Sequence, residues 1–199
     1  MNSVTPTTKP AGLAWPQLTP GILVKRYKRF MADVRMENGE TVVAHCPNSG
    51  RMTSCCEPGR NVYLSYHDNP RRKLKYTWEM IEMPSSLVGV NTLVPNRLVA
   101  QSIETGQVES LRGYDRIKKE VKVGKHTRLD LVLQKNAHDR CYVEIKNCTL
   151  VVNGIAQFPD AVTARGLKHL ETLRQLVSDG YQGVIFYLIQ RTDNTLVTV

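Results

Sequence analysis

The sequence lacks the hydrophobic segments that would carry it into or across a membrane. The chain has 199 residues and no run of about 18 consecutive apolar residues, so we expect no transmembrane helix. The first 20 residues contain no apolar core of the kind that a secretory signal has. We therefore expect a cytoplasmic protein without a membrane partner.

Cysteine pairs with the spacing of a metal or redox motif are also missing. The five cysteines include no Cys-x-x-Cys pair, and an odd number without a secretory signal indicates reduced thiols. A zinc site formed by His45, Cys46, Cys55 and Cys56 is conceivable, but adjacent ligands are an unusual spacing for zinc. Buried or merely tolerated cysteines are the favoured interpretation.

Acidic residues are fewer than basic residues. The chain has 18 Asp and Glu against 27 Lys and Arg, which gives a formal charge of +9. Such a surplus favours a polyanionic partner, above all a nucleic acid. Hydrophobic residues make up 41% of the chain, which is enough for an ordinary core in one large or two small domains.

The first part of the chain is predicted to form short strands. Residues 1–20 show no periodicity and are interpreted as a flexible lead-in. Asn38-Gly39 is a strong hairpin signal, and the absence of helical periodicity from residue 21 to residue 84 favours a small closed barrel or sandwich. The predicted strands are residues 22–27, 30–37, 40–45, 61–67 and 74–83.

Positive charge is concentrated in this predicted barrel. Between residues 21 and 80, eleven basic residues stand against six acidic ones, and aromatic residues are interleaved with them. This combination fits a groove that binds phosphates and stacks bases, although core aromatics under a solvated basic surface remain an alternative. The candidate nucleic-acid-binding residues are Lys25, Arg26, Lys28, Arg29, Arg51, Arg71, Arg72, Lys73 and Lys75.

The segment at residues 45–52 combines Pro, Asn, Ser and Gly. Such residues turn the chain and expose backbone N–H groups that can hold an anion. A plain tight loop between two strands fits the same composition equally well.

Residues 85–199 alternate strands and helices, which predicts a mixed α/β domain. Pro95 suits the first turn of a helix and Gly106 ends it. The last strand is apolar enough to be buried on both faces. The predicted elements are helices at 95–106 and 160–179 and strands at 114–123, 128–133, 141–148 and 183–190.

Asp130, Glu144 and Lys146 lie on two consecutive predicted strands, and Glu144 and Lys146 share a face because strand side chains alternate. Carboxylates in a buried sheet are costly unless they pair or bind metal, and they suit Mg²⁺ or Mn²⁺. Such an ion can activate water against a phosphate, while Lys146 stabilises developing charge. Asp followed by Glu-x-Lys is the minimal pattern of the PD-(D/E)xK nuclease core. The alternative is an ordinary ion pair on two surface strands.

One face of the second predicted helix carries Arg165, Lys168, His169 and Thr172 at spacings of three and four residues. Spacing alone favours a solvated polar surface for these side chains.

Several unusual motifs occur in order between residues 20 and 191. They are Val24-Lys25-Arg26-Tyr27-Lys28-Arg29-Phe30, residues 44–50 and 89–92, Pro95-Asn96, residues 141–147 and 158–163, Arg165-Gly166 and residues 168–170. Together they resemble the sugar fermentation stimulation protein A family.

This resemblance implies an N-terminal OB-like barrel joined to a PD-(D/E)xK restriction-endonuclease-like α/β domain. It also implies a DNA-binding protein linked to the regulation of sugar utilisation, with nuclease activity proposed from the fold. Carried over by motif, Asp130, Glu144 and Lys146 form the catalytic site, and the first two hold Mg²⁺ or Mn²⁺. Residues that could support this site are Glu120, Arg165, Lys168 and His169.

Members of this family usually continue for some tens of residues beyond Arg191, so the second domain is expected to be shortened at its C-terminus. Whether the site is catalytic stays open. The alternatives are a non-catalytic DNA-binding regulator of sugar-utilisation genes and an RNA-binding or RNA-processing protein. The sequence favours DNA as the partner and leaves the oligomeric state open.

Overall fold

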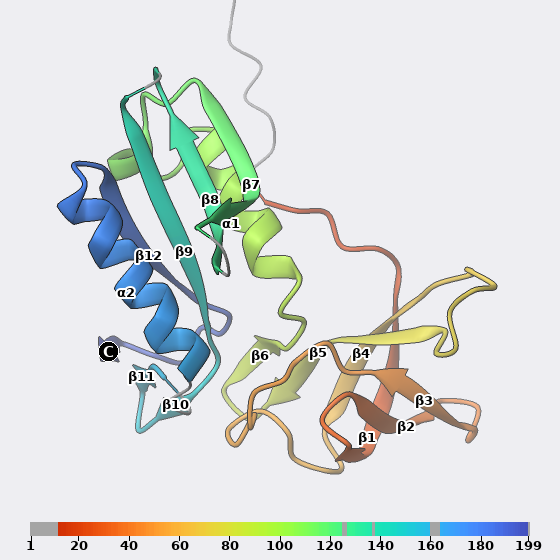
Figure 1. The fold of residues 1–199 in the computed structure, drawn as a ribbon. Coiled ribbons are helices and arrows are strands. Elements are labelled where there is room, and N and C mark those ends of the chain that lie inside the picture. The colour runs from red at the N-terminus through yellow and green to blue at the C-terminus, as the bar shows by residue number, and fades with distance from the viewer. Residues whose placement is uncertain (1–11, 125–126, 137, 160–163, 199) are drawn as a thin grey trace, which may run out of the picture. The chain divides into compact units, whose positions relative to one another are not determined.

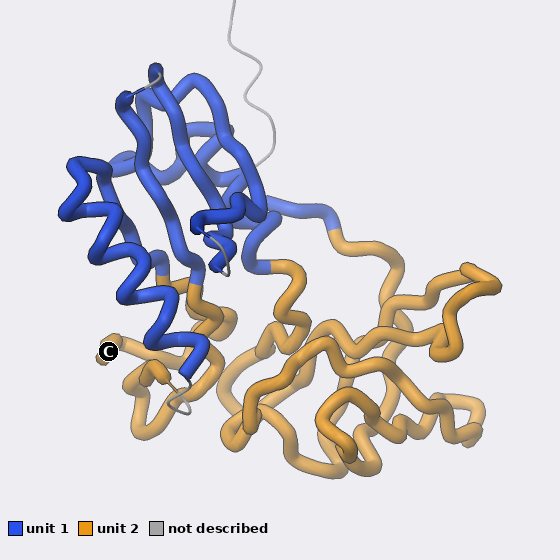
Figure 2. Tube along the Cα trace, viewed as in Figure 1, with its two compact units in different colours: residues 1–14, 95–145, 164–186 blue, residues 15–94, 146–163, 187–199 orange. Residues whose placement is uncertain are grey.

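The computed structural model describes residues 12–124, 127–136, 138–159 and 164–198 (Figure 1). The chain divides into two compact units (Figure 2). Unit 1 comprises residues 1–14, 95–145 and 164–186, and unit 2 comprises residues 15–94, 146–163 and 187–199. Within the described ranges, no helix is both long and apolar enough to cross a membrane.

Unit 2 is built around a closed β-barrel. Its sheet has the strand order β3-β2-β1-β4-β5-β6, and a parallel pairing of β3 with β5 closes it. The predicted barrel is therefore confirmed. The strands are β1 (Leu18–Tyr27), β2 (Met31–Met36), β3 (Thr41–His45), β4 (Asn61–Tyr66), β5 (Tyr76–Met83) and β6 (Ser86–Gly89).

The interior of the barrel is filled by large apolar side chains, among them Leu23, Leu64, Trp78 and Ile81, all fully buried. They come from alternate positions of twisted strands, and closure leaves few unpaired backbone groups at sheet edges. Strand β6 was not predicted from the sequence. It pairs with β5 across a tight turn at residues 84–85 and extends this sheet to Gly89.

A second, smaller sheet in unit 2 has the order β10-β11-β13. It consists of β10 (Val151–Val152), β11 (Ile155–Gln157) and β13 (Leu196–Thr198), with β13 parallel to β11. Gln190 joins nearby segments, because its N–H donates to Cys148 O at 3.1 Å and its carbonyl accepts from Gly89 N–H at 2.9 Å.

Unit 1 has an α/β arrangement around the sheet β12-β9-β8-β7, in which β7, β8 and β9 run antiparallel. Helix α2 lies along one face of this sheet (Figure 1) and packs Leu173 and Leu176 against Val132 and Tyr142. The elements are α1 (Val94–Glu104), a 3₁₀ turn η1 (Glu109–Leu111), β7 (Arg116–Val123), β8 (Thr127–Gln134), β9 (Arg140–Cys148), α2 (Ala164–Ser178) and β12 (Gln182–Ile189).

Two sequence-based expectations need adjustment. The strand at residues 183–190 was expected to be buried on both faces, but β12 is an edge strand whose residues are half-buried or exposed. The barrel begins at Leu18, so residues 18–20 belong to β1 and not to a lead-in. The expected start of the second helix at residues 160–163 lies outside the described residues, and α2 is described from Ala164.

Candidate nuclease-like site

Asp130 and Glu144 lie on neighbouring antiparallel strands of unit 1. The last backbone pair between β8 and β9 at this end is Leu131 with Val143. Continuing the same register by one residue puts Asp130 opposite Glu144, on the face where cross-strand side chains meet. The strand alternation predicted from the sequence thus brings the two carboxylates to one end of the β8–β9 ladder.

Two hydrogen bonds fix the Asp130 carboxylate. Its Oδ1 accepts from the Asn96 side-chain amide of α1 at 2.8 Å, and its Oδ2 accepts from the Ile145 backbone N–H at 2.7 Å. The pKa of this carboxyl is raised by burial and then by the negative charge of Glu144, against the lowering effect of the two hydrogen bonds.

Glu144 is 3% exposed and contacts the ring of His169, which is 8% exposed. His169 Nδ1 is in hydrogen-bond contact with Glu144 Oε1, so α2 closes over the carboxylate. The helical spacing suggested a solvated face for His169, and this expectation is wrong for that residue. Thr172, one turn later, is half-buried and donates a hydrogen bond to Lys168 O at 2.8 Å.

The other proposed site residues are all more exposed than Glu144. Lys146 is half-buried and follows Glu144 by two positions on β9. It belongs to unit 2, whereas Asp130 and Glu144 belong to unit 1, so its place beside the carboxylates stays a prediction. Glu120 is exposed on β7 and pairs with Arg128 at 4.0 Å. Arg165 and Lys168 are exposed on α2.

The donor chemistry of this cluster suits a hard divalent cation. Carboxylate oxygens are the ligands that Mg²⁺ prefers, and a cation between the two carboxylates would offset the repulsion that raises the pKa of Asp130. Within the described part of the chain, no group of three or more His, Cys, Asp or Glu side chains is arranged to hold a metal ion. An ion at Asp130 and Glu144 would therefore need water or substrate oxygens to complete its shell, as is usual for Mg²⁺.

The conceivable zinc site at His45, Cys46, Cys55 and Cys56 is not formed by the described residues. Cys46 and Cys55 are fully buried in the barrel core, and Cys46 Sγ contacts Met52 Sδ at 3.8 Å. Burial raises the pKa of the Cys55 thiol to about 11, which keeps it protonated at neutral pH. These cysteines are core residues of the barrel.

The candidate nucleic-acid-binding residues of the barrel fall into two groups. Arg72 and Lys75 are half-buried, with Arg72 donating to Thr77 Oγ1 at 2.8 Å and Lys75 donating to Asn69 O at 3.0 Å. Arg26 is half-buried as well. The exposed residues are Lys25, Lys28, Arg29, Arg51, Arg71 and Lys73.

Arg26 holds the segment at residues 45–52 in place. Its guanidinium donates to three backbone carbonyls of that segment, at 2.7 Å to Asn48, 3.0 Å to Gly50 and 3.3 Å to Arg51. The Gly50 N–H donates to the Asn48 side chain at 2.8 Å. This backbone N–H is therefore engaged within the loop and is not aimed at an external anion.

Two family models match the chain. The model described as "SfsA N-terminal OB domain" matches residues 24–90, and the model described as "Sugar fermentation stimulation protein RE domain" matches residues 93–199. The first range covers the closed barrel except for residues 18–23 of β1, and the β12-β9-β8-β7 sheet lies within the second range.

Curated relatives described as "Sugar fermentation stimulation protein homolog" are similar over most of the chain. The protein of Geobacter sulfurreducens is 52% identical over 180 residues, which are 90% of this chain and 77% of the relative. The protein of Pelobacter propionicus is 53% identical over 178 residues, which are 89% of this chain and 77% of the relative.

A solved structure of similar fold is that of Pyrococcus furiosus SfsA in complex with Ca²⁺. It superposes with a TM-score of 0.85 at 25% sequence identity, covering 96% of this chain and 80% of the other. The two-part architecture is thus shared by a protein determined with a divalent cation.

Proposed function

This chain belongs to the sugar fermentation stimulation protein family, and from that membership we propose that it binds DNA and cleaves phosphodiester bonds with a divalent cation. The observation that carries the proposal is the pair of carboxylates on adjacent strands beneath α2, the half-buried Asp130 and the buried Glu144. Two carboxylates that face each other repel, and a cation held between them would offset the repulsion that raises the pKa of Asp130.

Asp130 and Glu144 would hold the cation, and Mg²⁺ or Mn²⁺ is the proposed ion. The Pyrococcus furiosus protein was determined in complex with Ca²⁺, which supports a site for a hard divalent cation in this family. A bound Mg²⁺ or Mn²⁺ would polarise a phosphate and lower the pKa of its own water.

The protein's own contribution is to hold the reacting groups in fixed positions. The Ile145 N–H and the Asn96 amide orient the two oxygens of Asp130, and His169 orients Glu144. Ligands that are fixed before substrate arrives need little reorganisation during the reaction. In this proposal Lys146 donates to the phosphate oxygen on which negative charge develops.

A cleavage assay with two matched variants tests the proposal. Purified protein should cut single-stranded or duplex DNA when Mg²⁺ or Mn²⁺ is added, and Glu144→Gln should lower the rate by about 100-fold or more. Glu171→Gln makes the same chemical change on an exposed position of α2 and should cut like the wild type. Calorimetry with Mn²⁺ should show binding to the wild type and to Glu171→Gln, but weaker binding to Glu144→Gln. Equal cutting by all three proteins would show that Glu144 is not part of the catalytic site.

A second candidate is a non-catalytic DNA-binding regulator of sugar-utilisation genes. It is favoured by the engagement of both Asp130 oxygens in hydrogen bonds and by the lack of a three-ligand cluster among the described residues. This function predicts DNA binding that weakens steeply with salt and no turnover in Mg²⁺ or Mn²⁺. Turnover that disappears in Glu144→Gln would rule it out.

A further inference from the structure

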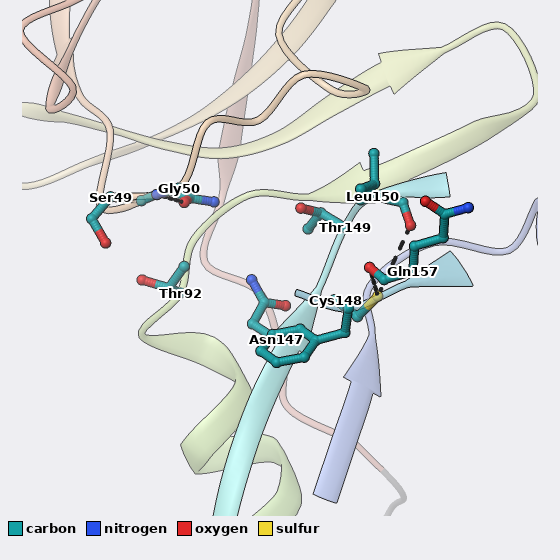
Figure 3. Close-up of a pocket in the computed structure, with 10 residues that line it drawn as sticks. Ser49, Gly50, Thr92, Asn147, Cys148, Thr149, Leu150 and Gln157 are labelled. Atoms are coloured by element: carbon teal, nitrogen blue, oxygen red, sulfur yellow. Dashed lines mark hydrogen bonds between the residues drawn. The ribbon is translucent and has the colours of Figure 1, made fainter. Parts of the chain in front are cut away.

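Unit 2 contains a small pocket that the carboxylate cluster does not use (Figure 3). Its volume is about 160 Å³. This is smaller than the roughly 300–1,000 Å³ of pockets that hold drug-sized ligands, so it suits a single small group. The lining residues are Asn48, Ser49, Gly50, Thr92, Asn147, Cys148, Thr149, Leu150, Gln157 and Phe158.

The lining of this pocket is polar and uncharged. None of its described lining residues is Lys, Arg, Asp or Glu, so the pocket is a poor match for a metal ion or a phosphate group. The Gly50 N–H donates to Asn48 Oδ1 and the Cys148 thiol donates to Gln157 O at 3.2 Å, which leaves these groups committed within the protein.

The pocket offers hydrogen-bonding groups next to an aromatic wall. Asn147 Oδ1 accepts from Gln190 Nε2 at 2.9 Å, which fixes the amide so that its nitrogen points toward the space between Thr92 and Thr149 (Figure 3). Phe158 is held edge-on against Tyr187, with ring centroids 5.3 Å apart. A flat ligand with hydrogen-bonding edges satisfies both features.

We infer that this pocket accepts one unpaired nucleobase of the nucleic acid that the chain binds, an inference that rests on the proposed function. Unstacked bases are held in proteins by aromatic contact and by hydrogen bonds from Asn, Ser and Thr to their edges. Ser49 is exposed, so the rim of the pocket reaches solvent and a base can enter.

The sequence motifs agree with a binding role for the pocket. Its lining draws on residues 44–50, 89–92, 141–147 and 158–163, four of the segments that carry the family resemblance. Only the third of these segments also supplies a residue of the carboxylate cluster. The other three segments contribute residues to the pocket but none to the proposed cation site.

The test compares a single strand of about ten nucleotides with an abasic strand of the same length and backbone, in EDTA to prevent cleavage. Fluorescence anisotropy gives the ratio of the two affinities for each protein. Asn147→Asp keeps the oxygen that accepts from Gln190 and removes the amide donor. Asn153→Asp makes the same change at an exposed turn outside the pocket lining and is the matched control. Thr149→Val, which removes a hydroxyl from the lining, is the second pocket variant.

The wild type should prefer the strand with bases, and Asn147→Asp should reduce this preference by about tenfold, since one base contact is worth that order of affinity. Thr149→Val should reduce it in the same direction, and Asn153→Asp should keep the wild-type ratio. An unchanged ratio in Asn147→Asp and Thr149→Val overturns the pocket inference while leaving nucleic-acid binding intact. Failure of the wild type to bind either single strand overturns the inference, whereas the proposed function is overturned only if the wild type fails to bind duplex DNA as well.

Discussion

Arg191 and Asp193 show how one ion pair can tie several loops together within unit 2. The Arg191 guanidinium makes two contacts of 2.6 Å to the Asp193 carboxylate and donates to Thr149 O at 2.9 Å and to Ser54 Oγ at 3.1 Å. Asp193 also accepts from Ser85 Oγ at 2.7 Å. The hydrogen bonds from Arg191, the largest influence, lower the pKa of Asp193 to about 2.

This lowered pKa gives a stability prediction with a definite pH window. The folded state favours the Asp193 carboxylate, so the stabilisation is complete above the ordinary Asp pKa of about 4 and is lost as pH falls toward 2. Asp193→Asn should lower the free energy of unfolding by about 2 kcal/mol at pH 7, and the gap to the wild type should narrow between pH 4 and pH 2.

Urea denaturation at several pH values measures this effect. Asp68→Asn is the control, because Asp68 is 89% exposed and its 3.9 Å contact with Lys75 should contribute little. A gap between Asp193→Asn and the wild type that stays constant from pH 7 to pH 2 would contradict the assigned role of the ion pair.

At the scale of single residues, the sequence predicted that Asp130 and Glu144 belong to one site, because a carboxylate in an apolar strand is conspicuous. Spacing alone did not predict His169 as their neighbour, and only the family resemblance placed it among the residues that could support the site. Helical spacing places His169 on a polar face, and only the packing of α2 shows that this part of the face covers Glu144. Asn96 was missed for a similar reason, since an Asn near a helix start is usually interpreted as a capping residue.

At the scale of elements, the long strands were predicted closely, because alternation over five or more residues is a clear signal. The short strands β6, β11 and β13 were missed, since three or four residues carry too little pattern. Closure of the barrel by β3 and β5 depends on pairing between residues about 30 positions apart, which local patterns do not encode. The edge position of β12 was missed for the same reason.

The start of α1 depends on a buried carboxylate in β5. Glu79, which is 5% exposed, accepts from Ser65 Oγ and from the Asn91 amide, each at 2.6 Å. Asn91 Oδ1 in turn accepts from Leu93 N–H at 2.9 Å, and its backbone carbonyl accepts from Val94 N–H at 3.2 Å. Glu79 therefore fixes the residue that turns the chain into the helix.

Glu79→Gln should be destabilising, because both oxygens of Glu79 accept hydrogen bonds, from Ser65 and from Asn91. The new side chain has only one acceptor oxygen, and its NH₂ group would face a group that now donates to Glu79. We expect a loss of about 1–3 kcal/mol in the free energy of unfolding, measured by urea denaturation. Glu82→Gln on the same strand is the control, since Glu82 is exposed and its hydrogen bonds lie at the surface. Equal stability of Glu79→Gln and Glu82→Gln would show that the buried network contributes nothing.

At the scale of the whole molecule, the charge of +9 attracts any polyanion, so basic residues alone do not identify a DNA-binding surface. Two of the exposed basic regions among the described residues allow a comparison. One is the barrel loop with Arg71 and Lys73, and the other is β7 with Lys118 and Lys122. Removing two charges from either region changes the net charge equally.

The comparison distinguishes DNA binding at the barrel loop from attraction by the net charge of the whole chain. If the barrel binds the phosphates, Arg71→Ala with Lys73→Ala should weaken DNA binding by about tenfold and lower the slope of log affinity against log salt by about 2. Lys118→Ala with Lys122→Ala should change both quantities much less. Arg72 is left in place, because its bond to Thr77 supports the barrel itself. Anisotropy titrations over a range of salt concentrations measure both the affinity and the slope. Equal losses of affinity in the two double variants would show that net charge determines binding, and the barrel loop would then not be part of the binding surface.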